Sequence, residues 1–198
     1  ISGQGTFASN VTTAMTFEPS ETPGWWFSRS DLPDELPILV SVRNVWTTGH
    51  IVSNIVLRSG GPSNYVRIVE HLICLKQGLG IDNLTVHIDS GDPPIFENGS
   101  IDIIALLNEG GRRELDTART CVSVREPVAV CDGHGGFLVL APPLEESQPL
   151  TLDCAIAFPN AIGEQRIRFP VTEDWVRHGA VARTNTPLRK VLYCKTIG

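Results

Sequence analysis

The sequence predicts an α+β protein built of two-layer sandwiches, in which antiparallel sheet packs on helices. Segments of alternating apolar and polar residues, typical of half-buried strands, surround a segment whose apolar residues follow helical spacing. Beyond Cys121 the pattern changes to short strand-like segments separated by turns. We therefore expect a complete first domain over residues 1–118 and the start of a second, partial domain over residues 119–198.

The first domain is expected to contain four strands and a central helix. Ser63 is a plausible N-cap, helical spacing of apolar residues runs from Tyr65 to Leu79, and Gly78 and Gly80 end the helix. Residues that alternate between apolar and polar predict strands at 5–17, 38–45, 54–58 and 84–88.

A second helix and a second sheet follow along the chain. Ser100 is the expected N-cap of this helix, which ends at residues 110–111. The glycine-rich segment 132–136 predicts a tight hairpin turn, and Thr172 caps a short last helix. The expected strands of the second domain lie at 122–124, 128–130, 137–139, 150–155 and 166–169. One helix is too little to cover that sheet, so we expect this domain to be partial.

Composition argues against two classes of partner. The 198-residue chain has a net charge of -6 and its basic residues are scattered, which disfavours nucleic acid as the main partner. No apolar run approaches the roughly 18 residues that would suggest a membrane span.

The five cysteines are widely spaced and form no Cys-x-x-Cys pair. They suggest neither a disulfide framework nor a zinc ribbon, and a reducing cytoplasm fits them best. Sequons at Asn10, Asn83 and Asn98 keep secretion open as the alternative.

Glu70 and His71 stand together in the otherwise apolar segment that we expect to be a helix facing the core. A buried charge and a buried imidazole each cost several kcal/mol unless they are paired or bound to a metal. Together they are the base and a ligand of a zinc hydrolase. The simpler readings are a hydrogen-bonded core histidine and a carboxylate on the helix surface.

Three motifs surround this pair in a specific order. Val-Glu-His-Leu at residues 69–72 is followed by Gly-Leu-Gly-Ile-Asp-Asn-Leu at 78–84 and by Pro-Ile-Phe-Glu-Asn-Gly-Ser at 94–100. In these motifs the chain resembles the zinc-dependent UDP-3-O-acyl-N-acetylglucosamine deacetylases of lipid A biosynthesis. Shorter matches at 3–5, 29–32, 47–48, 161–165 and 182–184 extend the resemblance over essentially the whole chain.

The resemblance implies a fold, a cofactor and residue roles. Two domains, each a mostly antiparallel sheet packed on helices, would close around one zinc ion. Glu70 would be the general base that deprotonates the metal-bound water, and His71 would be a zinc ligand. Thr184, in Ala-Arg-Thr, would help to stabilise the oxyanion that forms at an acetamide carbonyl. The implied substrate is an acylated UDP-N-acetylglucosamine.

The resemblance also implies ligands that this sequence does not contain. The family takes its remaining zinc ligands from a later His-x-x-x-Asp helix, and no histidine here stands four residues before an aspartate. We therefore expect the chain to be the first part of a longer enzyme, with its C-terminal half or a partner chain completing the cleft. The alternative is a catalytically inactive homologue that serves as a nucleotide-sugar-binding or protein-interaction module, which the sequence Asn-Thr-Pro at 185–187 favours.

Overall fold

The computed structural model describes residues 1–5, 10–46, 55–94, 96–159, 162–182, 192 and 196. Its packing divides the chain into unit 1, formed by Ile1–Arg112 and Glu173–Gly198, and unit 2, formed by Arg113–Thr172. The last helix thus groups with the first part of the chain. The expected domains, 1–118 and 119–198, differ from these units and stay a prediction.

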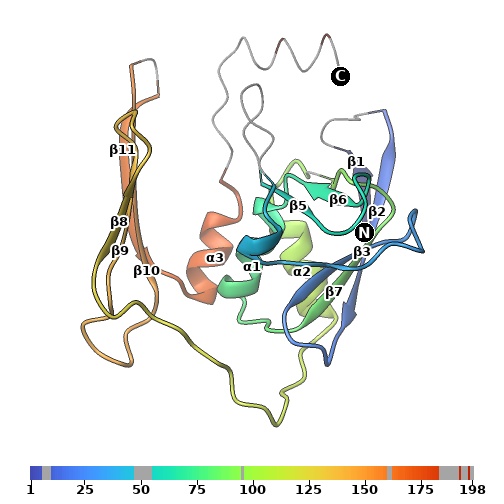
Figure 1. Ribbon diagram of the computed structural model, residues 1–198, viewed down its shortest axis with the longest axis horizontal. Coiled ribbons are helices and arrows are strands. Elements are labelled where there is room, and N and C mark those ends of the chain that lie inside the picture. The colour runs from blue at the N-terminus through green and yellow to red at the C-terminus, as the bar shows by residue number, and fades with distance from the viewer. Residues whose placement is uncertain are drawn as a thin grey trace. The chain divides into compact units, whose positions relative to one another are not determined.

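Unit 1 contains a five-stranded sheet with the strand order β1-β2-β7-β3-β4. Figure 1 labels β1, β2, β3 and β7 of this sheet. All neighbouring strands are antiparallel except β3 and β7, which run parallel. The connection from β3 to β7 is therefore a long crossover, residues 30–83, instead of a hairpin, and it includes the helix at Glu70–Gly78. The strands are β1 (Ser2–Gln4), β2 (Thr12–Pro19), β3 (Trp25–Arg29), β4 (Ile38–Leu39) and β7 (Leu84–Ile88).

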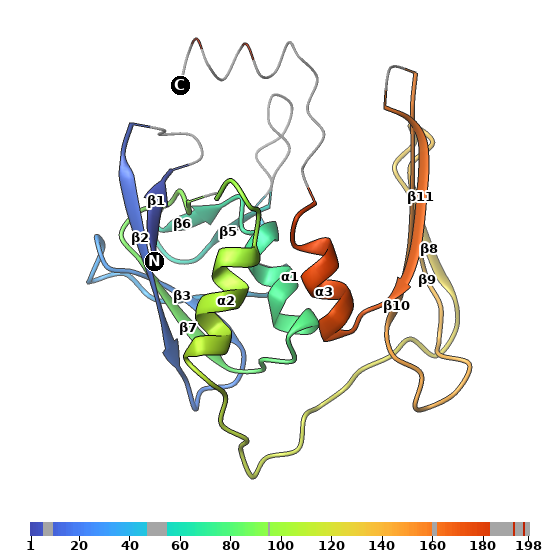
Figure 2. The ribbon, with the colours of Figure 1, turned by 180° about the vertical axis from the view of Figure 1, so that it is seen from behind.

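The core lies between one face of this sheet and the helices α1 (Glu70–Gly78) and α2 (Ile101–Glu109) (Figure 2). Alternate residues of β3 and β7 are buried, as a half-buried strand requires. The helices bury one stripe each, at Leu72 and Leu75 on α1 and at Ile104 and Leu107 on α2. This arrangement confirms the α+β prediction.

The predicted start of the central helix, at Tyr65, is wrong. Tyr65–Arg67 forms strand β6, which pairs antiparallel with β5 (Val56–Arg58). Ile68 then takes a φ of +53°, a left-handed conformation that is costly for a β-branched residue and interrupts any continuous helix. The helix begins only at Glu70, and Ser63 does not cap it.

Several expected strands also differ from the structure. The strand expected at 5–17 begins only at Thr12, as β2, and β1 precedes the expected range. Between the two strands, Gly5 N donates to Val11 O (3.0 Å). The strand at 38–45 ends after Leu39 and continues as the 3-10 helix η1 (Val42–Asn44), where the Asn44 amide donates to Leu39 O (2.8 Å). Residues 122–124 form no strand, and β3 was not expected.

Helix α3 (Glu173–Gly179) packs on α1 at Gly78. A Cβ added to Gly78 would fall on the side chain of Val176, so the two helices approach at a position that only glycine allows. Arg112 reinforces this arrangement, donating to Glu173 (3.2 Å) and to Leu79 O (2.9 Å).

Unit 2 consists of two separate two-stranded sheets. Asp132 closes the β8–β9 turn by accepting from the amides of His134 (2.7 Å) and Gly136 (2.9 Å), as the sequence predicted. None of the residues that the structure describes in this unit is buried. Its strands are β8 (Val128–Cys131), β9 (Phe137–Leu140), β10 (Thr151–Phe158) and β11 (Gly163–Pro170).

None of the helices within the described ranges is long and apolar enough to cross a membrane.

Candidate functional site

Glu70 and His71 occupy the first turn of α1. The left-handed Ile68 and the buried Val69 direct the chain out of β6 and into the helix at this point. Both residues are half-buried. The sequence had predicted that they would be fully buried on the core face of a helix, and this prediction is wrong. At a helix end a charged group remains near solvent, so the desolvation cost expected from the sequence is smaller.

The Glu70 carboxylate lies against the start of β5. Its Oε2 atom accepts a hydrogen bond from the backbone N–H of Ile55 (3.3 Å). A carboxylate in the first turn also interacts favourably with the positive end of the helix dipole. Glu70 is therefore held by a backbone hydrogen bond at the first turn of α1.

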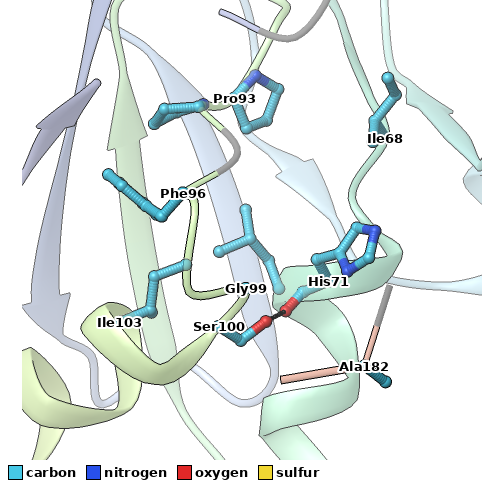
Figure 3. Close-up of a pocket in the computed structure, with 10 residues that line it drawn as sticks. Ile68, His71, Pro93, Phe96, Gly99, Ser100, Ile103 and Ala182 are labelled. Atoms are coloured by element: carbon cyan, nitrogen blue, oxygen red, sulfur yellow. Dashed lines mark hydrogen bonds between the residues drawn. The ribbon is translucent and has the colours of Figure 1, made fainter. Parts of the chain in front are cut away.

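His71 lines a hollow of about 220 Å3 beside the N-termini of α1 and α2. Among the described residues that line this hollow it is the only titratable one, and the rest of the described wall is mostly apolar (Figure 3). The lining residues are Ile68, His71, Leu72, Pro93, Pro94, Phe96, Gly99, Ser100, Ile103 and Ala182. An apolar wall with one imidazole suits a small ligand that carries a polar group at one end.

Ser100 joins three segments at the edge of this hollow. Its hydroxyl donates to His71 O (2.9 Å), and its backbone N–H donates to Ala180 O (2.9 Å). The sequence identified Ser100 only as an N-cap, and the structure does place it at the N-cap of α2, but without a side-chain capping bond. The position of Ser100 at the end of the third motif was the available signal for a role in the site.

The described residues do not make a zinc site on their own. A catalytic zinc needs about three protein ligands. Across the described ranges, no group of three or more His, Cys, Asp or Glu side chains could hold a metal ion. His71 is therefore a single candidate ligand, and we derive no catalytic step through zinc from these residues.

Thr184 lies outside the described residues. The last described residue before it, Ala182, lines the same hollow as His71. The structure thus places His71 and Ala182 at one hollow, with Glu70 next to His71 in the first turn of α1.

Comparison with known proteins relates this geometry to a family. The family model described as LpxC, UDP-3-O-acyl N-acetylglycosamine deacetylase, matches residues 1–198. The chain belongs to this family. Family membership was predicted from the three motifs, and it is confirmed.

Relatives named UDP-3-O-acyl-N-acetylglucosamine deacetylase show how much of the family's length the chain represents. The protein of Campylobacter hominis is 30% identical over 173 residues, which are 86% of this chain and 55% of the relative. The protein of Bdellovibrio bacteriovorus is 30% identical over 187 residues, 93% of this chain and 59% of the relative. The chain therefore spans a little over half the length of these relatives.

Within the family, the second motif of this chain has a structural role. Gly80, with a φ of +65°, turns the chain after α1, and Lys76 then donates to Asp82 O (3.1 Å). The Asn83 side chain accepts from Gly24 N (3.1 Å), which fixes the start of β3 beside β7. The motif therefore connects the helix that carries Glu70 and His71 to the central strands.

Proposed function

We propose that this chain forms part of a zinc-dependent deacetylase that acts on an acylated UDP-N-acetylglucosamine in lipid A biosynthesis, in the cytoplasm. The observation that carries the proposal is the pair Glu70 and His71 at the open end of α1, beside an apolar hollow, in a chain that matches the family over residues 1–198. The substrate class comes from the names of the relatives.

The reaction is the hydrolysis of an acetamide. Water adds to the carbonyl carbon, the C–N bond breaks, and acetate and the sugar amine are released. Glu70 takes the proton of the attacking water, and Thr184 donates to the oxyanion that develops on the carbonyl oxygen. His71 is one metal ligand, with the others outside the described residues. Zinc, when bound, lowers the pKa of its water to about 7.

The test measures acetate release from the acylated nucleotide sugar by the full-length protein with zinc. We expect Glu70→Gln to lower kcat by about 100-fold or more, because a positioned base contributes about 10²–10⁴-fold. Thr184→Val should cost about 100-fold, the usual effect of losing one oxyanion donor. His87→Ala is the matched control, since His87 lies on β7 and bonds Glu18. Wild-type turnover by the Glu70→Gln variant would sink the proposal.

The small number of possible metal ligands among the described residues favours a second candidate function. Because His71 is a single candidate ligand within the described ranges, an inactive homologue that binds a nucleotide sugar or a partner protein is the alternative. Calorimetry with UDP-N-acetylglucosamine and metal analysis of the purified protein separate the two. Binding without stoichiometric zinc and without acetate release identifies the binding module.

A further inference from the structure

The turn at Gly99 and Ser100 connects the two segments that the proposed active site needs. Ser100 is only 4% exposed, and both its hydroxyl and its N–H are engaged, with His71 O and Ala180 O respectively. One residue therefore contacts the first turn of α1 and the segment that leaves α3. The bond to His71 is visible in Figure 3.

The Ser100 hydroxyl does not serve the helix that it precedes. An N-cap serine ordinarily accepts a hydrogen bond from an amide of the first turn, and this bond is absent at Ser100. Its hydroxyl instead donates to a carbonyl of α1. Stabilisation of α2 alone therefore does not explain why the Ser100 hydroxyl bonds the carbonyl of His71.

Gly99 brings the segment that follows α3 close to this turn. Its φ of +68° is a conformation that glycine adopts readily, and a Cβ added there would collide with Ala180 O. The collision would displace the carbonyl that accepts from Ser100 N. Two residues beyond Ala180, Ala182 lines the hollow beside His71.

We propose that Gly99 and Ser100 are positioning residues that hold His71 in register with the segment 180–182. The inference rests on the proposed function, in which His71 and Thr184 act on one substrate. Neither Gly99 nor Ser100 takes part in the chemistry. They set the distance between the first turn of α1 and the segment that follows α3, two parts of unit 1 that unit 2 separates in the sequence.

The first test measures NMR resonances of His71 and Ala182 in the full chain, and it does not require the protein to be an active enzyme. In Ser100→Ala, we expect the ring resonances of His71 and the methyl resonance of Ala182 both to shift, and Ser100→Thr to restore them, because threonine keeps the hydroxyl. In Gly99→Ala, we expect the amide of residue 100 to exchange with solvent at least about tenfold faster, because its acceptor is displaced.

Ser90→Ala is the matched control for this experiment. The Ser90 hydroxyl also bonds backbone in unit 1, accepting from Asp92 N (3.1 Å), and it bonds the Thr13 hydroxyl. Among the described residues it forms no hydrogen bond to α1 or to residues 180–182. It should leave the Ala182 methyl resonance in place. An unchanged Ala182 resonance in both Ser100→Ala and Gly99→Ala overturns the proposal, since a purely local role shifts only the neighbours of residue 100.

The second test uses the active full-length enzyme. Misplacement of a catalytic group by about 1 Å can cost about 100-fold, so we expect Ser100→Ala to lower kcat by about 10- to 100-fold with little change in KM. Ser100→Thr should recover most of that loss. Wild-type kcat in Ser100→Ala contradicts the inference. If Ala182 shifts as expected but the wild-type protein releases no acetate, the proposed function fails and the coupling between the two segments stands.

Discussion

At the scale of single residues, Glu70 has two separable tasks. Its carboxylate accepts from Ile55 N and so contributes to the local structure, and under the proposed function it also accepts a proton. A glutamine retains an acceptor oxygen of the same reach but cannot act as a base at neutral pH. Substitutions at this one position can therefore separate folding from chemistry.

We predict that Glu70→Gln has a free energy of unfolding within about 0.5 kcal/mol of the wild type, the range usual for substitutions that keep their contacts. Glu70→Ala should lose about 1 kcal/mol, because the Ile55 amide loses its partner. Urea unfolding measures both, and hydrogen exchange at Ile55 reports the bond directly. Equal stability of the alanine and glutamine variants would show that this hydrogen bond contributes nothing.

The pair Arg29 and Asp31 illustrates a residue-scale interaction with a pH signature. Arg29 donates to Asp31 (2.6 Å) and to Tyr65 O (2.7 Å), connecting the end of β3 to β6. The hydrogen bond from Arg29 lowers the pKa of the Asp31 carboxyl below its ordinary value of 3.8. A lowered folded-state pKa stabilises the protein above the ordinary value, and this contribution is lost as the pH falls through the folded-state pKa.

We predict that Asp31→Asn lowers the free energy of unfolding at pH 7 by up to about 1 kcal/mol, the upper range for an ion pair at the surface. The difference from the wild type should shrink as the pH falls below the ordinary Asp pKa of 3.8 and through the lowered folded-state pKa. Denaturation at pH 7, 4 and 2.5 measures it, with the exposed Asp34→Asn as control. A difference that does not depend on pH would exclude the ion pair as its cause.

At the scale of elements, the contact between α1 and α3 decides whether the last part of the chain joins unit 1. Gly78 provides the space for Val176, and Arg112 adds an ion pair with Glu173. The segment 180–182 follows directly from α3, so the docking of this helix also places the wall of the hollow. A displacement of α3 should therefore also move Ala182 in the wall of the hollow.

We predict that Gly78→Ala lowers the free energy of unfolding by about 1–3 kcal/mol, the usual cost of overpacking. In an exposed helix the same change would be stabilising by about 1 kcal/mol. Combining it with Val176→Ala should recover most of the loss, which a double-mutant cycle in urea measures. Additive effects of the two substitutions would mean that the two side chains do not compete for space.

At the scale of the whole molecule, the buried core lies almost entirely in unit 1. Every buried residue of the described chain belongs to this unit, whereas the strands of unit 2 expose large apolar side chains such as Phe137 (76% exposed). Few buried contacts give a low local free energy of opening. The segment from Gly111 to Pro127 contains no helix or strand and is exposed almost throughout.

We predict that limited trypsin digestion cleaves first after Arg113, Arg119 or Arg125, because exposed irregular backbone is the preferred substrate of proteases. Mass spectrometry of the earliest fragments identifies the sites. A variant with glutamine at these three positions should slow the first cleavage. Initial cleavage after Arg67 or Lys76, which lie on β6 and α1, would contradict the assignment of the core to unit 1.

The pattern of neighbouring residues along the chain was sufficient to predict some of the structural elements of this protein. Alternation identified β7 with its bounds at Leu84 and Ile88, and the turn at 132–136 followed from its glycines. The three motifs identified the family. Local pattern failed where a distant partner decides the conformation: Tyr65–Arg67 is apolar enough for a helix, but pairs with Val56–Arg58 as a strand.

The sequence by itself determined the fold class and the family, and it singled out Glu70 and His71 as candidate site residues. Only the tertiary structure decided that this pair lies half-buried at a helix end, and that Ser100 connects it to the segment after α3. The physical reason is that fold class and motifs depend on neighbours along the chain. Burial and hydrogen-bond partners depend instead on segments 29 and 80 residues away, which meet only in the folded protein.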